Sequence, residues 1–271
     1  MNHAIKSEHF SDQSPVRLLQ ISDCHLMAEA DREFAGIAPY QSLQAVLSHA
    51  QKNVAFDCVI NTGDIAQQAL PQTYELYQST LSKLERPHYW VRGNHDESKH
   101  FPSLSENDQP TVIDLGAWCM ILINSQVDQH VSGMISDHDL IQLDRLLTQH
   151  QHQYAIIALH HNTFDVGCEW LAPHRLQNSE QLLACLNAHD HVRLVISGHV
   201  HQDFSYQHRQ MTFLSCPSTS IQFKPKQIEF CLDQVAPGYR LIELHANGHF
   251  DSVVHRVEDA VGHVDFSLKS Y

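Results

Sequence analysis

The sequence predicts a layered α/β fold, in which helices pack against sheets of short strands. Short apolar runs alternate with segments of helical periodicity from Val16 onward, and polar residues of the metal-ligand type follow several of the apolar runs. With 271 residues the chain is long enough to bury a large core, and we expect one domain over residues 1–271. Residues 1–15 are expected to form a polar tail.

Six short apolar runs are the candidate strands of this fold. They cover residues 16–21, 56–60, 88–91, 118–123, 154–159 and 192–196. Near the end of the chain, residues 239–245 and 249–257 flank the dipeptide Asn247-Gly248, which suits the positive φ values of a tight turn. We therefore expect a terminal two-stranded ribbon over about residues 238–258.

Three segments place apolar residues at helical spacing and are expected to pack on the strands. They are residues 40–55, residues 73–84 and the stretch that follows Ser136. Ser136 and Asp139 resemble a capping box at the start of the third segment. The apolar stripe of that segment is formed by Leu140, Leu143, Leu146 and Leu147, and we interpret it as core.

The composition excludes several classes of protein. Lys and Arg number 17 against 31 acidic residues, so the formal charge of −14 disfavours binding of nucleic acid through a basic face. No run of about 18 uncharged apolar residues is present, so we expect no membrane span. The polar N-terminal region lacks the layout of a secretory signal, which makes the cytoplasm the expected location.

The cysteines argue against a disulfide framework. There are seven of them, an odd number, and they lie far apart without a Cys-x-x-Cys pair. The same spacing argues against a zinc site built from thiolates. We expect reduced, mostly buried thiols.

Residues of the metal-ligand type follow five of the predicted strands. In chain order these segments are Asp23-Cys24-His25, Gly63-Asp64, Gly93-Asn94-His95-Asp96, His160-His161 and Gly198-His199-Val200-His201. In open α/β sheets, ligands gather at the carboxyl ends of the strands, so five distant segments can converge on one crevice.

The spacing within each segment also favours a common site. Residues two apart in an extended segment point to the same side, so Asp23 with His25, and His199 with His201, are expected to face one pocket. Glycines 63, 93 and 198 precede ligands, where the absence of a side chain lets the backbone turn sharply.

The donor types indicate which metals would bind. Carboxylates, imidazoles and one amide, without a thiolate, suit manganese, iron, zinc or cobalt. Two ions roughly 3.5–4 Å apart need a shared ligand, and the carboxylate of Asp64 is the natural bridge.

The order of these motifs resembles that of the calcineurin-like metallophosphoesterases. The resemblance implies a layered α/β/β/α sandwich of two mixed β-sheets flanked by helices. It implies two divalent or mixed-valence transition metal ions. Iron and manganese are the expected metals, and zinc and cobalt are the alternatives. It assigns one ion to Asp23, His25, Asp64 and His201, and the other to Asp64, Asn94, His160 and His199.

The same resemblance implies the catalytic residues. His95 would donate a proton beside the substrate, with Asn94 and Asp64 as its catalytic partners, and His25, Asn94, His95 and His160 would face the substrate. The family shows His-x-Pro or His-His-Pro at the fourth motif, whereas this chain has His160-His161-Asn162-Thr163. We choose His160 as the ligand because the first histidine binds metal in the family.

Four further segments resemble bacterial class III cyclic-AMP phosphodiesterases, and the resemblance extends from about Leu18 to Val257. These segments are residues 124–127, 167–171, 217–225 and 236–240, and each is a pocket wall or a structural turn. The implied reaction is hydrolysis of 3′,5′-cyclic AMP to 5′-AMP by a bridging hydroxide. Two divalent ions, two aspartates and the hydroxide leave about one positive charge, which matches a phosphodiester monoanion.

Several alternatives stay open. A phosphodiesterase of the same fold that cleaves glycerophosphodiesters or other nucleotides would share the metal ligands, and a non-catalytic metal-binding scaffold is a different class of function. Asp96 orients His95 or caps a following helix, and capping is favoured. The role of His161 and the existence of a homodimer are undecided, and Cys24 is expected to point away from the metals.

Overall fold

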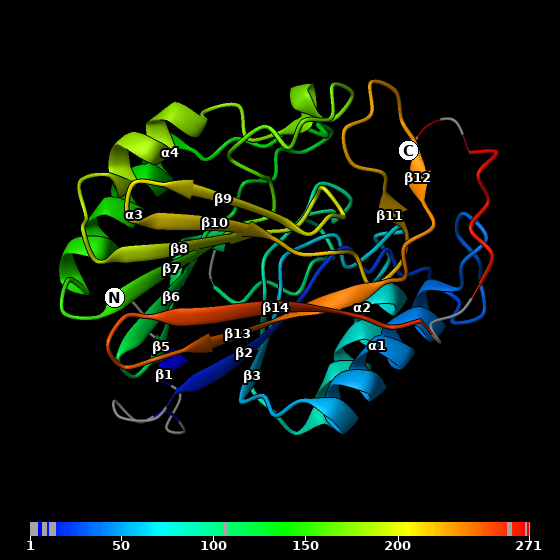
Figure 1. The fold of residues 1–271 in the computed structure, drawn as a ribbon, viewed down its shortest axis with the longest axis horizontal. Coiled ribbons are helices and arrows are strands. Elements are labelled where there is room, and N and C mark those ends of the chain that lie inside the picture. The colour runs from blue at the N-terminus through cyan, green and yellow to red at the C-terminus, as the bar shows by residue number, and fades with distance from the viewer. Residues whose placement is uncertain are drawn as a thin grey trace.

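Two β-sheets lie face to face, and helices cover the outer face of each (Figure 1). The computed structural model describes residues 5–6, 10, 15–105, 108–258, 262–268 and 270. The expected α/β/β/α layering is confirmed. Most of the polar tail expected over residues 1–15 lies outside the described residues, but β1 (Ile5–Lys6) pairs in parallel with β5 (Thr111–Leu115).

The first sheet has five strands in the order β14-β13-β2-β3-β4. Its parallel strands are β2 (Val16–Ile21), β3 (Cys58–Asn61) and β4 (His88–Trp90). The C-terminal hairpin, β13 (Gly238–Leu244) and β14 (Phe250–Arg256), pairs antiparallel as predicted. It is not a separate ribbon, because β13 also pairs with β2 and thereby extends the sheet.

The second sheet has seven strands in the order β1-β5-β6-β7-β8-β10-β9. Its four parallel neighbours are β6 (Trp118–Leu122), β7 (Tyr154–Ala158), β8 (Val192–Ser197) and β10 (Met211–Ser215). The sequence patterns missed β5, β9 (Phe204–His208) and β10. The middle of β9 is exposed at the edge of the sheet, so it carries no apolar run. A small sheet of β11 (Gln222–Phe223) and β12 (Leu232–Asp233) lies apart from the two large ones.

Helices cover both outer faces. On the first sheet lie α1 (Pro39–Asn53) and α2 (Pro71–Leu81), which continues as the 3-10 turn η1 (Ser82–Leu84). Proline at the start of α1 and α2 supplies the φ angle of a first helical turn without losing a needed donor. On the second sheet lie α3 (Asp137–Gln149) and α4 (Ser179–Leu186). Every helix in the described part of the chain is too short or too polar to cross a lipid bilayer.

Three apolar layers hold the sandwich together. Leu19 of β2 packs against α1 and α2, whereas its neighbour Leu18 packs between the two sheets against residues such as Met120 of β6. This alternation follows from the two-residue period of a strand. All seven cysteines are free thiols and five are buried, as expected. The buried layer between the sheets fixes their relative position and so brings their loops together at one end.

The N-cap of α3 gives a test of local stability. The backbone N–H of Asp139 donates to the Ser136 hydroxyl at 3.0 Å, and that hydroxyl donates to the Asp139 carboxylate at 2.8 Å. Replacement of Ser136 by alanine should lower the free energy of unfolding by about 1 kcal/mol, because a helical N–H loses its acceptor. The shift would be read from urea unfolding curves.

The matched control for this substitution is Ser98→Ala. Ser98 is exposed and lies outside the helices and strands, so its replacement should leave the urea midpoint nearly unchanged. Equal midpoints for Ser136→Ala and Ser98→Ala would mean that the cap contributes nothing to stability.

Candidate metal centre

Loops from both sheets meet at the carboxyl ends of β2, β3, β4, β7 and β8. Each of these strands ends two to four residues before a predicted ligand, so the parallel pairing delivers the ligands to the same end of the sandwich. The structure brings all seven predicted ligand residues together. Six of them are buried, and Asn94 is partly buried.

Asp23, His25 and His201 form the first group. The Nε2 atom of His201 lies 3.3 Å from Oδ1 of Asp23 and 3.2 Å from Nε2 of His25. These potential ligand atoms are close enough to share one ion. The group joins the loops after β2 and β8, one from each sheet.

Asn94, His160 and His199 form the second group. The Oδ1 atom of Asn94 lies 3.0 Å from Nε2 of His160 and 2.9 Å from Nδ1 of His199. Asp64 stands between the groups, since its Oδ2 is 3.8 Å from Nε2 of His25 and 3.4 Å from Nε2 of His160. One carboxylate oxygen therefore reaches a histidine of each group.

The hydrogen bonds of the ring nitrogens that point away from the site indicate that both ligand groups suit cations. Nδ1 of His201 lies 2.8 Å from the carbonyl oxygen of Ile221, and Nδ1 of His160 lies 2.8 Å from that of Thr62. A carbonyl can only accept, so both Nδ1 atoms carry the proton and a neutral ring leaves a lone pair on Nε2. Such a bond at the second nitrogen is typical of metal-binding histidines.

Lone pairs consequently face lone pairs inside the site. Nε2 of His25 confronts Nε2 of His201, while Nδ1 of His25 lies 2.9 Å from the Oε1 atom of Gln67. Nε2 of His160 confronts the oxygens of Asn94 and Asp64, which also accept. Contacts between acceptors repel unless a proton or a cation lies among them. The donor set therefore fits divalent cations without rearrangement of the protein.

The backbone of the ligand loops is unusual. Asp23, His25, Asp64, His199 and His201 have positive φ values of 52°, 48°, 50°, 68° and 49°. For residues other than glycine this conformation costs about 1–3 kcal/mol each and clusters at functional sites. Asp23 and His25 lie in one group as predicted, whereas His199 and His201 lie in different groups, and the reason given for the pairing was wrong. The two segments are not extended; left-handed turns aim the side chains.

Hydrogen bonds between loops hold these turns in place. The N–H of Asp23 donates to the carbonyl of Gly63 at 2.9 Å, and the N–H of His25 donates to that of Asp64 at 3.0 Å. The N–H of His199 donates to both oxygens of the Asp23 carboxylate at 3.1 Å. The loops after β2, β3 and β8 therefore brace one another.

Glycine is required at two positions by close approach. A methyl group at Gly93 would overlap the Asp64 carboxylate, and one at Gly198 would overlap the Ser22 hydroxyl and crowd the Asp23 carboxylate. Both glycines directly precede a predicted ligand, which agrees with the crowding that the sequence indicates.

Asp96 has a different role from the one predicted. No helix begins in the described stretch 97–105, so Asp96 caps none. Its buried carboxylate instead accepts hydrogen bonds from the backbone N–H groups of Ile65, Ala66 and Gly93 at 3.0–3.2 Å, and from the Tyr74 hydroxyl at 3.1 Å. Asp96 thus ties the loop of Asp64 to the loop of Asn94. Sequence spacing gave no sign of this, because Ile65 and Ala66 lie 31 and 30 residues before Asp96.

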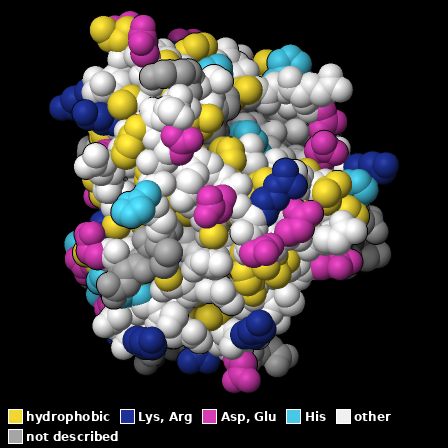
Figure 2. Space-filling view, turned by 90° about the vertical axis from the view of Figure 1, so that its right-hand side faces the viewer, with side chains coloured by type: hydrophobic (Ala, Val, Ile, Leu, Met, Phe, Trp, Pro, Cys, Tyr) yellow, Lys and Arg dark blue, Asp and Glu magenta, His cyan; other side chains and the backbone are white. Residues whose placement is uncertain are grey.

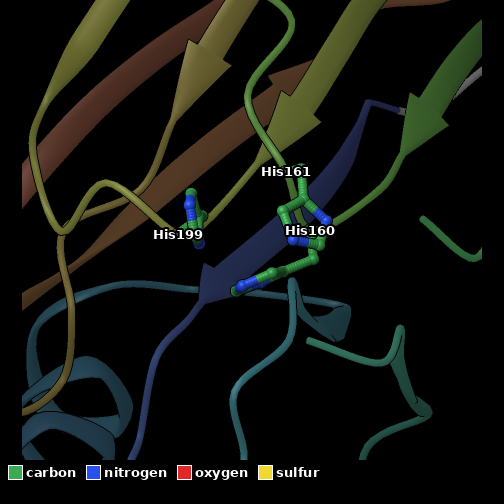
Figure 3. Close-up of side chains that lie close together, drawn as sticks. All are labelled: His160, His161 and His199. Atoms are coloured by element: carbon green, nitrogen blue, oxygen red, sulfur yellow. The ribbon is translucent and has the colours of Figure 1, made fainter. Parts of the chain in front are cut away.

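His160 and His161 point in different directions from adjacent positions (Figure 3). Nδ1 of His161 lies 2.8 Å from the Ser125 hydroxyl, and its Nε2 lies 3.0 Å from the carbonyl oxygen of Val131. Both ring nitrogens of His161 are therefore engaged, although the ring is near His160 and His199. The geometry favours His160 as the ligand. Ser125 lies in a segment that the sequence had singled out, but its contact with His161 required the fold.

His95 lies at the edge of the site. Its backbone N–H donates to Oδ1 of Asp64 at 2.8 Å, and its ring meets that of His25 edge-on at 5.0 Å. The side chain is only partly buried, unlike those of the histidines around it. Burial lowers the pKa of His95, although the charge of Asp64 opposes the shift.

Burial and neighbouring charges shift the pKa values of the other groups of the site. Burial lowers the pKa of His25 and of His199, so both rings are neutral at pH 7 and available as ligands. Burial alone would raise the pKa of Asp64, but His160 and the other histidines outweigh it and hold this pKa well below its usual range. Burial likewise opposes the charge of His160, but the Asp64 carboxylate outweighs it and raises the pKa of His160 to about 9, so a proton lies between these two groups when no cation does. Burial raises the pKa of Cys24 to about 12, and its thiol accepts a hydrogen bond from Asn61 in the apolar layer, as expected for a packing role.

On the face shown in Figure 2, Lys and Arg side chains are scattered, with acidic side chains among them. The side chains of the two candidate ligand groups are aspartate, asparagine and histidine. An anionic substrate at this site would therefore depend on bound cations.

Comparison with known proteins agrees with this geometry. The sequence model of the family described as calcineurin-like phosphoesterase matches residues 16–203. A Vibrio vulnificus protein named 3′,5′-cyclic adenosine monophosphate phosphodiesterase CpdA is 34% identical over 100% of both chains. The protein of the same name from Pseudomonas aeruginosa is 31% identical and covers 94% of this chain and 95% of its own.

Solved structures show the same fold at low sequence identity. A dimetal phosphatase from Danio rerio superposes with a TM-score of 0.62 at 15% identity, over 90% of this chain and 99% of its own. The purple acid phosphatase PPD1 from yellow lupin gives 0.64 at 12% identity, over 94% of this chain and 54% of its own. The ligand motifs, the layered fold and the full-length relatives lead to one conclusion: this chain belongs to the calcineurin-like phosphoesterase family.

Proposed function

We propose that this protein hydrolyses 3′,5′-cyclic AMP to 5′-AMP at a centre of two metal ions. The proposal rests on one observation: buried imidazole nitrogens and carboxylate oxygens converge on one site. The Nδ1 atoms of His160 and His201 donate to backbone carbonyls, which directs the Nε2 atoms of both rings into that site. The substrate follows from the full-length relatives, which are named as cyclic-AMP phosphodiesterases.

The residues divide into two ligand sets around a shared carboxylate. Asp23, His25 and His201 would hold one ion and Asn94, His160 and His199 the other, with Asp64 common to both. Nitrogen and oxygen donors without thiolate favour iron or manganese, with zinc or cobalt as alternatives. Such ions, when bound, would lower the pKa of water to about 7 and so supply a hydroxide nucleophile at neutral pH.

The protein side chains would orient the substrate and move a proton. Asn94 carries N–H groups that can bind a phosphate oxygen while its Oδ1 faces the histidines. His95 is attached through its backbone to Asp64, and its ring is partly exposed. These features suit His95 to protonate the 3′ oxygen as it departs.

A panel of substrates tests the proposed reaction. Metal-loaded protein, purified without oxygen and analysed for its metals, should turn over cyclic AMP with a higher kcat/KM than cyclic GMP or an aryl phosphodiester. Preference for a glycerophosphodiester would favour the alternative diesterase function. Inert protein with manganese or iron supplied would favour the non-catalytic scaffold.

Replacement of Asp64 by alanine should remove metal and activity together, because one carboxylate serves both ligand sets. Metal content per chain and cyclic-AMP turnover would be measured on the same preparation. The control is Asp190→Ala, an exposed aspartate that should leave both quantities unchanged. An Asp64→Ala protein that keeps two ions and full turnover is incompatible with a shared ligand.

Replacement of His95 by alanine should slow turnover by ~10²- to 10⁴-fold, which is the usual contribution of a general acid. The metal content should not change, because His95 is assigned to neither ligand set. The exposed His152 supplies the control substitution, His152→Ala, with normal turnover. Loss of metal from His95→Ala would instead make His95 a ligand, as its proximity to His25 and Asp64 allows.

A further inference from the structure

A cavity of about 220 Å³ opens beside the metal centre. His199, one of the proposed ligands, forms part of its wall, so the cavity and the metal centre are adjacent. The other walls come from four regions of the chain that are distant in sequence. They are lined by Val131, Trp170, Leu171, His174, Phe223, Phe230 and Ser270.

Three aromatic rings of this wall pack edge to face. The Trp170 ring lies 5.0 Å from that of Phe223 at 80° and 5.1 Å from that of Phe230 at 79°. Phe223 and Phe230 are 5.7 Å apart at 69°. Such perpendicular contacts are favoured by the ring quadrupoles and hold each ring in a defined orientation. We call these three residues the aromatic box.

The aromatic box is attached directly to the metal centre. The ring of Phe223 stacks on that of His201 with centroids 4.0 Å apart and an angle of 8° between the planes. The carbonyl oxygen of Ile221, two residues before Phe223, accepts the hydrogen bond from Nδ1 of His201. The short strand β11 therefore fixes both a metal ligand and one wall of the cavity, which sets the distance between them.

The described residues of the cavity wall are mostly apolar or aromatic. None of them is Asp, Glu, Lys or Arg. A charged group would be desolvated here without a partner, which is costly. A flat, uncharged ring would instead exchange water for aromatic contacts. The cavity therefore suits the part of a substrate that is planar and apolar, next to a centre that suits a phosphate.

We propose that the aromatic box binds the purine base of the cyclic nucleotide and so selects nucleotides over other phosphodiesters. This inference rests on the proposed function, because it places the base relative to a phosphate at the metal centre. Glycerol and other small polyols have no flat apolar face to place against these rings. Trp170 is then a specificity residue that contacts substrate without taking part in the reaction.

Replacement of Trp170 by leucine should raise KM for cyclic AMP about tenfold, because aromatic stacking typically contributes this order of affinity per base. The kcat should change little. Ribose 3′,5′-cyclic phosphate without a base should show the same kcat/KM in the variant and the wild type. Trp170→Phe keeps an aromatic ring and should recover most of the affinity for cyclic AMP.

Two further variants guard against a general effect on folding. Phe230→Leu removes a different ring of the aromatic box. It should likewise raise KM for cyclic AMP and leave kcat/KM for ribose 3′,5′-cyclic phosphate unchanged. Tyr206→Leu removes an exposed aromatic side chain of β9 and should leave both substrates unaffected. Equal losses for cyclic AMP and the base-free analogue in Trp170→Leu and Phe230→Leu would overturn the assignment.

Binding of adenosine gives a readout that does not depend on catalysis. Adenosine carries the base without a phosphate, and Trp90 and Trp118 are buried away from the cavity wall. Adenosine should quench tryptophan fluorescence saturably in the wild type but not in Trp170→Phe. Quenching without any hydrolysis of cyclic AMP would refute the proposed function and keep the base site. Hydrolysis with no quenching, and with KM unchanged in Trp170→Leu, would refute the base site alone.

Discussion

The mutual repulsion of buried lone pairs is the interaction on which the rest of this structure depends. Imidazole nitrogens, carboxylate oxygens and the Asn94 amide oxygen from five loops lie 2.9–3.8 Å from one another. Buried acceptors without donors are costly, so the arrangement is favourable only when cations are bound or protons are retained. The donors gathered here are of the type that holds cations, in a chain whose net charge is −14.

The fold restrains this arrangement by several means. The apolar layer between the sheets fixes the strand ends, and left-handed turns at residues such as Asp23 and His201 aim the side chains. Asp96 joins the loops of Asp64 and Asn94 through backbone N–H groups. The strain of the turns is local, whereas the packing that offsets it extends over the whole sandwich. A rigid site of this kind selects for cations that match its geometry.

The candidate metal site and the cavity beside it differ in chemical character. The ligand groups suit the charged phosphate, and the aromatic box suits an uncharged ring. Phe223 and His201 connect the two through direct stacking, so a change in one is expected to affect the position of the other. The sequence left open whether two segments, residues 167–171 and 217–225, form pocket walls or structural turns. Both contribute to the cavity wall, through Trp170, Leu171 and Phe223.

The sequence by itself determined the strands that carry the candidate ligands, the helices with clear apolar stripes and the candidate ligand residues that the fold brings together. These are local properties, because periodicity, glycine and ligand type can be read within about ten residues. It did not reveal β9, whose exposed edge position removes the apolar pattern, or the partner of the C-terminal hairpin. Only the tertiary structure decided that Asp96 joins two loops, that both ring nitrogens of His161 are engaged, and that left-handed turns orient the ligands. Each of these depends on atoms that are distant in the chain and adjacent in space, and such contacts leave no periodic trace in a single sequence.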